Sequence, residues 1–224
     1  MDRIVVLSGA GLSAESGLGT FRDVNGLWTA YDLAEVATPE GFARDPAKVL
    51  AFYDARRANA AGAAPNAAHR ALARLSRRAG VTLVTQNVDD LLDRAGAEGV
   101  VHMHGRLDRA LCAACGHRWA APPVMAVDLP CPRCGGGPAR PDVVWFGEVP
   151  HAMDRIEAAL ARADLFVSIG TSGTVYPAAG FVEAARAAGA QTLELTLEPS
   201  GGRFDAVRRG PATETVPAWV AEVL

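Results

Sequence analysis

Short runs of β-branched and aliphatic residues recur along the chain, and alanine-rich stretches of helical character separate most of them. The apolar runs cover residues 4–7, 81–85, 143–145, 165–169 and 192–197, and the helical stretches cover residues 67–78, 153–162 and 177–188. Fully apolar strands that alternate with helices are typical of a parallel sheet covered on both faces. We therefore predict an α/β fold built on a doubly wound, Rossmann-like parallel sheet.

Two segments interrupt this alternation. Residues 26–64 contain no convincing strand and predict a helical insertion, whereas residues 107–141 are rich in Cys, Pro and Gly and predict a loop-rich module. We expect a single domain over residues 1–224, with its Rossmann-like part formed by residues 1–25, 65–106 and 142–224. A ligand site is expected in the cleft between this sheet and the two inserted segments.

The four cysteines form two close pairs. Cys112 and Cys115 are one Cys-x2-Cys pair, Cys131 and Cys134 are the other, and 15 residues separate the pairs. This spacing predicts a tetrahedral Zn²⁺ ion held by four thiolates. Four protein ligands fill the coordination sphere, so the zinc would be structural rather than catalytic. A redox disulfide pair and a ligand role for His117 are the alternatives that we favour less.

The first apolar run leads directly into a glycine-rich turn. Gly9 and Gly11 would allow backbone N–H groups to approach a pyrophosphate, and Ala14 occupies the third small position. The acids at the spacing usual for ribose recognition, Asp32 and Glu35, fall in the helical insertion instead. We therefore expect a bound dinucleotide, but not in the arrangement of a hydride-transferring dehydrogenase. A tight turn without a ligand is the alternative.

Charge and hydropathy argue against several other classes of protein. The 22 basic and 25 acidic residues give a net charge of −3, without the basic excess of a nucleic-acid-binding protein. No apolar run approaches the roughly 20 residues that cross a bilayer, and residues 4–7 are too few for the core of a signal peptide. Because cysteine pairs of this kind suggest metal rather than disulfides, we expect a cytoplasmic protein.

Five separated motifs resemble those of the sirtuin family and occur in the family's order. They are GAGLSAESG at residues 9–17, TFR at 20–22, TQNVD at 85–89, HMHG at 102–105 and GTS at 170–172. The resemblance extends over nearly the whole chain and includes the cysteine module. It implies an NAD-dependent protein-lysine deacylase, in which the acyl oxygen of a modified lysine attacks the ribose carbon that carries nicotinamide. Nicotinamide then leaves, and the acyl group is transferred to ADP-ribose.

The resemblance also implies a role for individual residues of these motifs. His104 would be the general base for a ribose hydroxyl, for which an imidazole with an ordinary pKa of about 6.5 is well suited. His102 is a rival that spacing alone does not exclude. Asn87 and Asp89 would shape the nicotinamide pocket and take part in catalysis. The residues implied in NAD binding are Gly9, Ala10, Gly11, Ala14, Thr20, Phe21, Arg22, Trp28, Gln86, Asn87, Asp89, Gly170, Thr171, Ser172, Thr196, Leu197, Glu198 and Ala212.

Some of these positions depart from the family pattern or have a simpler explanation. Thr196 stands where the family often has Asn, so a hydroxyl is kept but an amide is lost. Gly19 stands where bulkier residues are common, which is expected to loosen the cofactor loop. Asn87 and Asp89 are also favoured helix caps, and Phe21 could simply pack in the core.

The helical insertion carries a pair of residues that suggests the acyl group. Tyr53 and Arg56 are three residues apart and therefore share one helix face. An arginine fork binds a carboxylate, and a tyrosine hydroxyl adds a donor. The pair resembles the sirtuin branch that removes succinyl and malonyl groups, and Ala37 matches a small residue that widens its acyl pocket. The alternative is a surface helix with a solvated arginine. The resemblance places the substrate peptide as an added strand beside Val143, Phe146, Gly147 and Glu148.

Two other functions compete with deacylation. One is the transfer of ADP-ribose to a protein or small nucleophile, and the other is a non-catalytic module that binds nucleic acid or senses NAD. Tyr53, Arg56 and His104 together favour deacylation. We expect acyl-lysine proteins or peptides as partners, no binding to nucleic acid or membranes, and a monomer.

Overall fold

The computed structural model describes residues 2–19 and 32–224, and the larger part of it is built on a six-stranded parallel sheet. The strand order is β3-β2-β1-β7-β8-β9. The chain builds outward from β1 through β2 to β3, and then crosses to β7 on the other side of β1. The strand order therefore reverses between β1 and β7, which is where ligands bind in open parallel sheets. The strands are β1 (Ile4–Ser8), β2 (Val81–Thr85), β3 (Val101–His102), β7 (Leu165–Ile169), β8 (Gln191–Thr196) and β9 (Ala206–Arg209).

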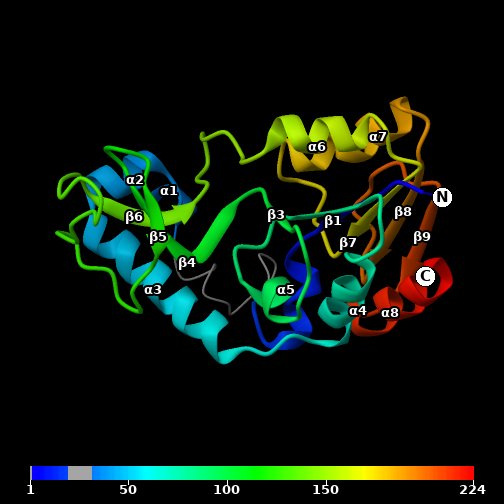
Figure 1. Cartoon of the computed structure of the whole chain (residues 1–224), viewed down its shortest axis with the longest axis horizontal. Helices are drawn as coiled ribbons and strands as arrows, with labels where there is room; N and C mark the ends of the chain where they lie inside the picture. The colour runs from blue at the N-terminus through cyan, green and yellow to red at the C-terminus, as the bar shows by residue number, and fades with distance from the viewer. Residues whose placement is uncertain (1, 20–31) are drawn as a thin grey trace.

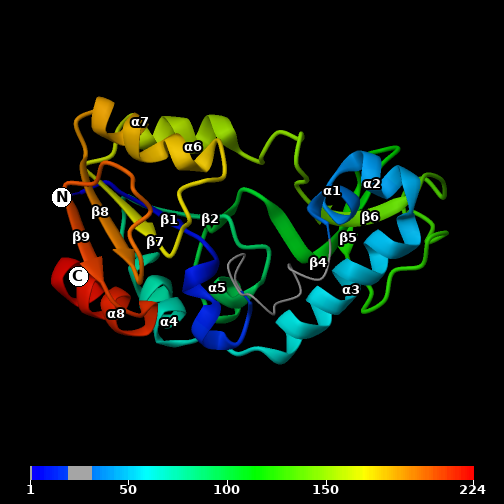
Figure 2. The ribbon, with the colours of Figure 1, turned by 180° about the vertical axis from the view of Figure 1, so that it is seen from behind.

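Helices cover both faces of this sheet, as the alternating pattern predicts. Alternate side chains of a strand point to opposite faces, so Ile4 and Val6 pack in one core cluster while Val5 and Leu7 pack in another. The first cluster includes residues of α4 (Ala67–Leu75) and α8 (Ala212–Val223), and the second includes residues of α6 (Met153–Leu160) and α7 (Phe181–Ala187). Figure 1 and Figure 2 show these helix pairs on opposite sides of the sheet.

The smaller part lies at the far end of the elongated molecule from both termini (Figure 1). It contains a three-stranded antiparallel sheet in the order β5-β4-β6 and three helices of the insertion. The strands are β4 (Gly105–Cys112), β5 (Arg118–Ala120) and β6 (Ala139–Val143), and the helices are α1 (Leu33–Val36), α2 (Pro39–Arg44) and α3 (Pro46–Gly62). Within the described residues, no helix is long and apolar enough to cross a membrane.

One predicted strand was assigned to the wrong sheet. Residues 143–145 do not join the parallel sheet, because Val143 ends β6 and pairs with Gly105 of β4. Val143 and Trp145 are buried against Phe52 and Tyr53 of α3 instead. A short apolar run predicts that a segment is buried, but it does not predict which element packs against that segment. The pattern alone could therefore not distinguish the two sheets.

Helix α3 carries Tyr53 and Arg56, the pair predicted to bind the acyl group, and is attached to the cysteine module. It begins after Asp45, whose carboxylate accepts the Lys48 N–H at 3.0 Å. One helix position beyond Arg56, the buried Arg57 donates to the Leu107 carbonyl at 2.7 Å and pairs with Asp54. These contacts hold α3 against β4 while Tyr53 and Arg56 line the cavity described below.

The remaining elements are short and lie in the connections between the strands and helices of the larger part. They are the 3₁₀ turns η1 (Ala10–Leu12), η2 (Ala14–Ser16) and η3 (Ala178–Gly180) and the short helix α5 (Leu91–Arg94). Turns η1 and η2 follow β1, and α5 follows β2 after the segment that carries Asn87 and Asp89.

Candidate active site and zinc centre

A cavity of about 920 Å³ lies between the two parts of the molecule. One wall is formed by the segments that follow β1, β2, β7 and β8 at the carboxyl ends of the parallel strands. The opposite wall is formed by α3 and by the segment after β6. This is the position that the strand reversal predicts for a ligand.

The glycine turn after β1 touches the turn after β7. A Cβ atom on Gly11 would lie 2.7 Å from the Gly170 Cα, and one on Gly9 would lie 2.8 Å from the Gly170 carbonyl oxygen. The Gly11 N–H also donates to the Gly170 carbonyl at 2.9 Å. Side chains at Gly9 and Gly11 would therefore separate the two turns that form the floor of the cavity.

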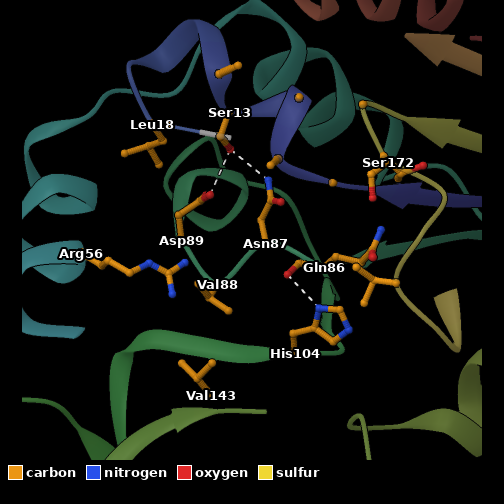
Figure 3. A pocket seen from close by; sticks show the side chains of 18 of the residues that line it. Ser13, Leu18, Arg56, Gln86, Asn87, Val88, Asp89, His104, Val143 and Ser172 are labelled. Atoms are coloured by element: carbon orange, nitrogen blue, oxygen red, sulfur yellow. Dashed lines mark hydrogen bonds between the residues drawn. The ribbon is translucent and has the colours of Figure 1, made fainter. Parts of the chain in front are cut away.

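Ser13 connects the residues that follow β2 into one hydrogen-bonded cluster. Its hydroxyl donates to Asp89 Oδ2 at 3.0 Å and accepts from Asn87 Nδ2 at 3.1 Å (Figure 3). His69 Nε2 lies 3.3 Å from the same hydroxyl. Because the Asn66 N–H donates to His69 Nδ1 at 3.2 Å, the imidazole proton sits on Nε2 and points at Ser13.

This cluster holds Asn87 and Asp89 in fixed orientations. His69 is fully buried, and burial lowers its pKa from 6.5 to about 4, so it remains neutral at neutral pH. Burial raises the pKa of Asp89. Sequence reasoning missed the parts played by Ser13 and His69. Ser13 lies inside the GAGLSAESG motif and could have been singled out, whereas His69 carries no local signal beyond its place near a helix start.

His104 has the protonation state that a base requires. Its Nδ1 lies 3.2 Å from the Gln86 carbonyl oxygen (Figure 3), which can only accept, so Nδ1 carries the proton and Nε2 carries a lone pair. Burial lowers the pKa of His104, although the bond to the carbonyl works in the opposite direction. The imidazole is therefore neutral at neutral pH and able to accept a proton.

The rival histidine has a different environment. His102 Nε2 lies 2.9 Å from Asp93 Oδ2 of α5, and Asp93 also accepts from Arg106 at 2.7 Å. His104 lines the cavity, whereas His102 is turned toward α5. The geometry thus separates two residues that sequence spacing could not.

Most of the residues predicted to bind NAD come together in this cavity. Thr196 donates its hydroxyl to the Glu198 carbonyl at 2.7 Å, so that hydroxyl shapes the turn after β8. Thr20, Phe21, Arg22 and Trp28 lie outside the described residues. The predicted residues that line the cavity are Gly9, Ala10, Gly11, Ala14, Gln86, Asn87, Asp89, Gly170, Thr171, Ser172, Thr196, Leu197, Glu198 and Ala212.

The predicted acyl-binding residues line the same cavity from the other wall. Tyr53 is 1% exposed, and Ala37 is also buried. The Arg56 guanidinium lies 5.5 Å from the centre of the Tyr53 ring, and Figure 3 shows its side chain extending toward Asp89. Burial raises the pKa of Tyr53, which keeps its hydroxyl protonated, and lowers the pKa of Arg56.

The segment after β6 is tied to the chain through its backbone. The Val144 N–H donates to the His104 carbonyl, and the Phe146 N–H donates to the Ala37 carbonyl, both at 2.9 Å. The Trp145 N–H donates to Glu148 Oε2 at 2.8 Å. Val143, Phe146, Gly147 and Glu148 all line the cavity. The N–H groups of residues 144–146 are thus satisfied within the chain.

The four cysteines form a cluster that fits a zinc ion. Cys112 Sγ lies 3.8 Å from Cys134 Sγ, Cys115 Sγ lies 3.7 Å from Cys131 Sγ, and all four sulfur atoms lie within 4.8 Å of one another. Tetrahedral Zn–S bonds of about 2.3 Å place sulfur atoms about 3.8 Å apart, whereas a disulfide bond is about 2.05 Å long. The cluster therefore has metal-site rather than disulfide geometry.

Comparison with known proteins identifies a family. The model of the Sir2 family matches residues 9–177. An NAD-dependent protein deacylase of Caulobacter vibrioides is 60% identical, covering 99% of this chain and 97% of that protein. The NAD-dependent protein deacylase SIR2rp3 of Leishmania major is 50% identical, covering 99% of this chain and 95% of that protein.

Solved structures agree with this comparison. A crystal structure of a Sir2 homologue in complex with NAD aligns with a TM-score of 0.90 at 38% identity, covering 99% of this chain and 89% of that one. A mutant Sir2 homologue in complex with ADP-ribose aligns with a TM-score of 0.91, also at 38% identity, covering 99% and 91%. The fold, the cavity and the matched sequence agree, and this chain belongs to the Sir2 family, the sirtuins.

Proposed function

We propose that this chain is an NAD-dependent protein-lysine deacylase that transfers the acyl group to ADP-ribose and releases nicotinamide. The observation that carries the proposal is the neutral His104, which presents an unprotonated Nε2 in the same cavity as the glycine turn. Relatives that are 50–60% identical over almost the whole chain are named NAD-dependent protein deacylases. NAD is consumed in this reaction and is therefore a co-substrate.

Each wall of the cavity has its own part in the reaction. The glycine turn and the segments after β7 and β8 would bind the dinucleotide, because all three line the cavity. Asn87 and Asp89, held by Ser13, form the nicotinamide pocket. When nicotinamide leaves and the acyl oxygen bonds to the ribose carbon, His104 Nε2 takes the proton of a ribose hydroxyl. That hydroxyl oxygen then attacks the acyl carbon, the bond from this carbon to the lysine nitrogen breaks, and addition of one water molecule yields the free lysine amine and O-acyl-ADP-ribose.

Zinc has a structural part in this proposal. Cys112, Cys115, Cys131 and Cys134 would hold one ion and supply the coordination that closes their loops. Module residues Pro123 and Met125 contact Arg57 of α3, so the metal site supports the helix that carries Tyr53 and Arg56. We propose that residues 107–141 form the zinc module and that residues 26–64, of which the structure describes 32–64, form the helical insertion.

We further propose that the enzyme removes acidic acyl groups, such as succinyl and malonyl, as well as acetyl. A guanidinium and a phenolic hydroxyl in one buried pocket suit a carboxylate, because charge-assisted hydrogen bonds gain strength away from water. The buried Ala37 leaves room for the longer chain. The substrates are acyl-lysine proteins or peptides that lie along the segment from Val143 to Glu148.

The test is a paired assay with acetyl-lysine and succinyl-lysine peptides, following nicotinamide release and peptide mass. Replacing Arg56 by Ala should lower kcat/KM for desuccinylation about 10- to 100-fold, the range for a hydrogen bond to a charged group. Deacetylation should fall much less. Arg44→Ala, at an exposed position of α2, is the matched control. Equal losses for both acyl groups would discard the carboxylate pocket.

The same assay separates deacylation from its rivals. Labelled NAD that leaves label on protein, without loss of acyl groups, would favour ADP-ribosyl transfer. NAD binding without turnover would favour a sensor. We also propose that the enzyme acts as a cytoplasmic monomer without nucleic acid, which cell fractionation and light scattering would test.

A further inference from the structure

The hydroxyl of Tyr53 has a partner that fixes its direction. The Trp145 indole Nε1–H donates to the Tyr53 hydroxyl oxygen at 3.0 Å, and both side chains are almost completely buried, at 3% and 1% exposure. An indole N–H can only donate, so the tyrosine oxygen is the acceptor in this bond. The hydroxyl proton must therefore point to a different acceptor.

The indole is itself held from several sides. The Arg140 guanidinium carbon lies 3.5 Å from the centre of the Trp145 ring system, a cation–π geometry. Arg140 also forms a two-point ion pair with Glu148, at 2.6 and 2.9 Å. Glu148 in turn accepts the backbone N–H of Trp145 at 2.8 Å. The ring and the backbone of Trp145 are thus fixed by the same pair of charged residues.

We propose that Trp145 is a positioning residue for acyl selectivity. Its indole N–H, fixed by Arg140 and Glu148, keeps the Tyr53 hydroxyl as a hydrogen-bond donor toward the carboxylate of an acidic acyl group. The inference rests on the proposed function, because it concerns the carboxylate pocket of that same site. It assigns selectivity to a residue that need not touch the carboxylate.

The chemistry predicts which kinetic constants change. An acetyl group has no carboxylate and cannot use a donor at this position, whereas a succinyl group can. The usual net strength of a hydrogen bond predicts that losing one neutral donor lowers the affinity for the succinyl peptide about three- to tenfold. The loss should appear mainly in KM for the succinyl peptide, since the Tyr53 hydroxyl contacts the acyl end and not the reacting atoms.

The experiment is a double-mutant cycle on the zinc-loaded enzyme. Trp145→Phe removes the indole N–H and keeps an aromatic ring, and Tyr53→Phe removes the hydroxyl. For each variant and for the double variant, the ratio of kcat/KM on succinyl and acetyl peptides is measured. We expect Trp145→Phe to lower this ratio about three- to tenfold in the wild-type background. In the Tyr53→Phe background it should change the ratio less than twofold.

Two results would overturn the inference. One is an equal loss of kcat/KM for both peptides in Trp145→Phe. The other is that Trp145→Phe lowers the succinyl-to-acetyl ratio by the same factor in the Tyr53→Phe background as in the wild type, because Trp145 would then act without Tyr53. The wild-type ratio tests the proposed function separately. A wild type that removes acetyl but not succinyl refutes the carboxylate pocket before any variant is compared.

A second variant guards against a misfolded Trp145→Phe protein. Arg140→Lys keeps the indole and the charge but loses the planar, two-point contact with Glu148. It should lower the same ratio by a smaller factor, with zinc content and thermal melting as checks on the fold. A folded Arg140→Lys variant with an unchanged ratio would refute the part assigned to Arg140 and Glu148.

Discussion

Mild acid should destabilise the folded chain, and His69 should make a separable contribution to this loss. This imidazole is fully buried, accepts the Asn66 N–H on Nδ1 and is therefore bound in its neutral form. Protonation would place a second N–H against that N–H donor, at a position where the side chain is fully buried. The folded state excludes the charged form for this reason, while the unfolded chain does not.

The direction follows from the two pKa values. Above pH 6.5 the imidazole is neutral in both states, and His69 makes no pH-dependent contribution. As the pH falls from 6.5 to about 4, His69 binds a proton in the unfolded chain but not in the folded chain, so the free energy of unfolding decreases. Below about pH 4 both states are protonated, and the loss levels off. Linkage puts the whole loss at about 3 kcal/mol, a large share of the stability of an ordinary domain.

The assay is urea unfolding between pH 7.5 and pH 4.5, comparing the wild type with His69→Gln. Glutamine does not titrate, so the free energy of unfolding of His69→Gln should fall less over this range than that of the wild type. The difference between the two falls should be about 3 kcal/mol at most. Carboxylates and the zinc-binding thiolates also take up protons in acid, but they do so in both proteins and cancel in the difference.

Parallel curves for the two proteins would refute the reasoning, because they would mean that His69 binds its proton equally well in both states. A stability of His69→Gln that is lower than that of the wild type by the same amount at every pH would also contradict the predicted pH dependence. That offset would measure only the lost hydrogen bonds to Ser13 and Asn66.

Four further outcomes are expected. Ala152→Gly should raise the free energy of unfolding by about 1 kcal/mol in urea melts, because Ala152 has a φ of 56°. Gly11→Ala should weaken ADP-ribose binding in a thermal-shift titration, since its Cβ would meet the Gly170 backbone. Cys131→Ser should release zinc to a chromogenic chelator and lower the melting temperature. His104→Ala should lower deacylation about 100-fold or more in the peptide assay, and an active variant would contradict its role as base.

The sequence predicted those parts of the fold that have a local apolar signal. Strands β2 and β7 begin and end at the predicted residues, because each is a five-residue run in which apolar residues predominate. Strand β9 has four exposed residues and is held by backbone pairing with β8, so it offers no apolar run to detect. The run at residues 143–145 was apolar but was assigned to the wrong sheet, because its burial comes from α3.

The site shows the same division between local and distant signals. The glycine turn, the HMHG motif and the cysteine pairs are continuous in sequence and could be found by inspection. The cluster around Ser13 could not, since its partners His69, Asn87 and Asp89 are 56 to 76 residues away. The bond between Trp145 and Tyr53 spans 92 residues and involves two residues that ordinary core packing would also explain.

Adjacent arginines on α3 give the enzyme a built-in constraint on how it can evolve. Arg56 lines the cavity, while Arg57 donates to the Leu107 carbonyl of β4. Successive residues of a helix are about 100° apart, so inserting one residue into α3 before this pair would turn Arg56 to the direction that Arg57 has now and turn Arg57 away from β4. Drift in selectivity should therefore proceed by substitution at Tyr53 or Arg56. Changes in the length of α3 would uncouple the helix from the zinc module and should be rare among functional descendants.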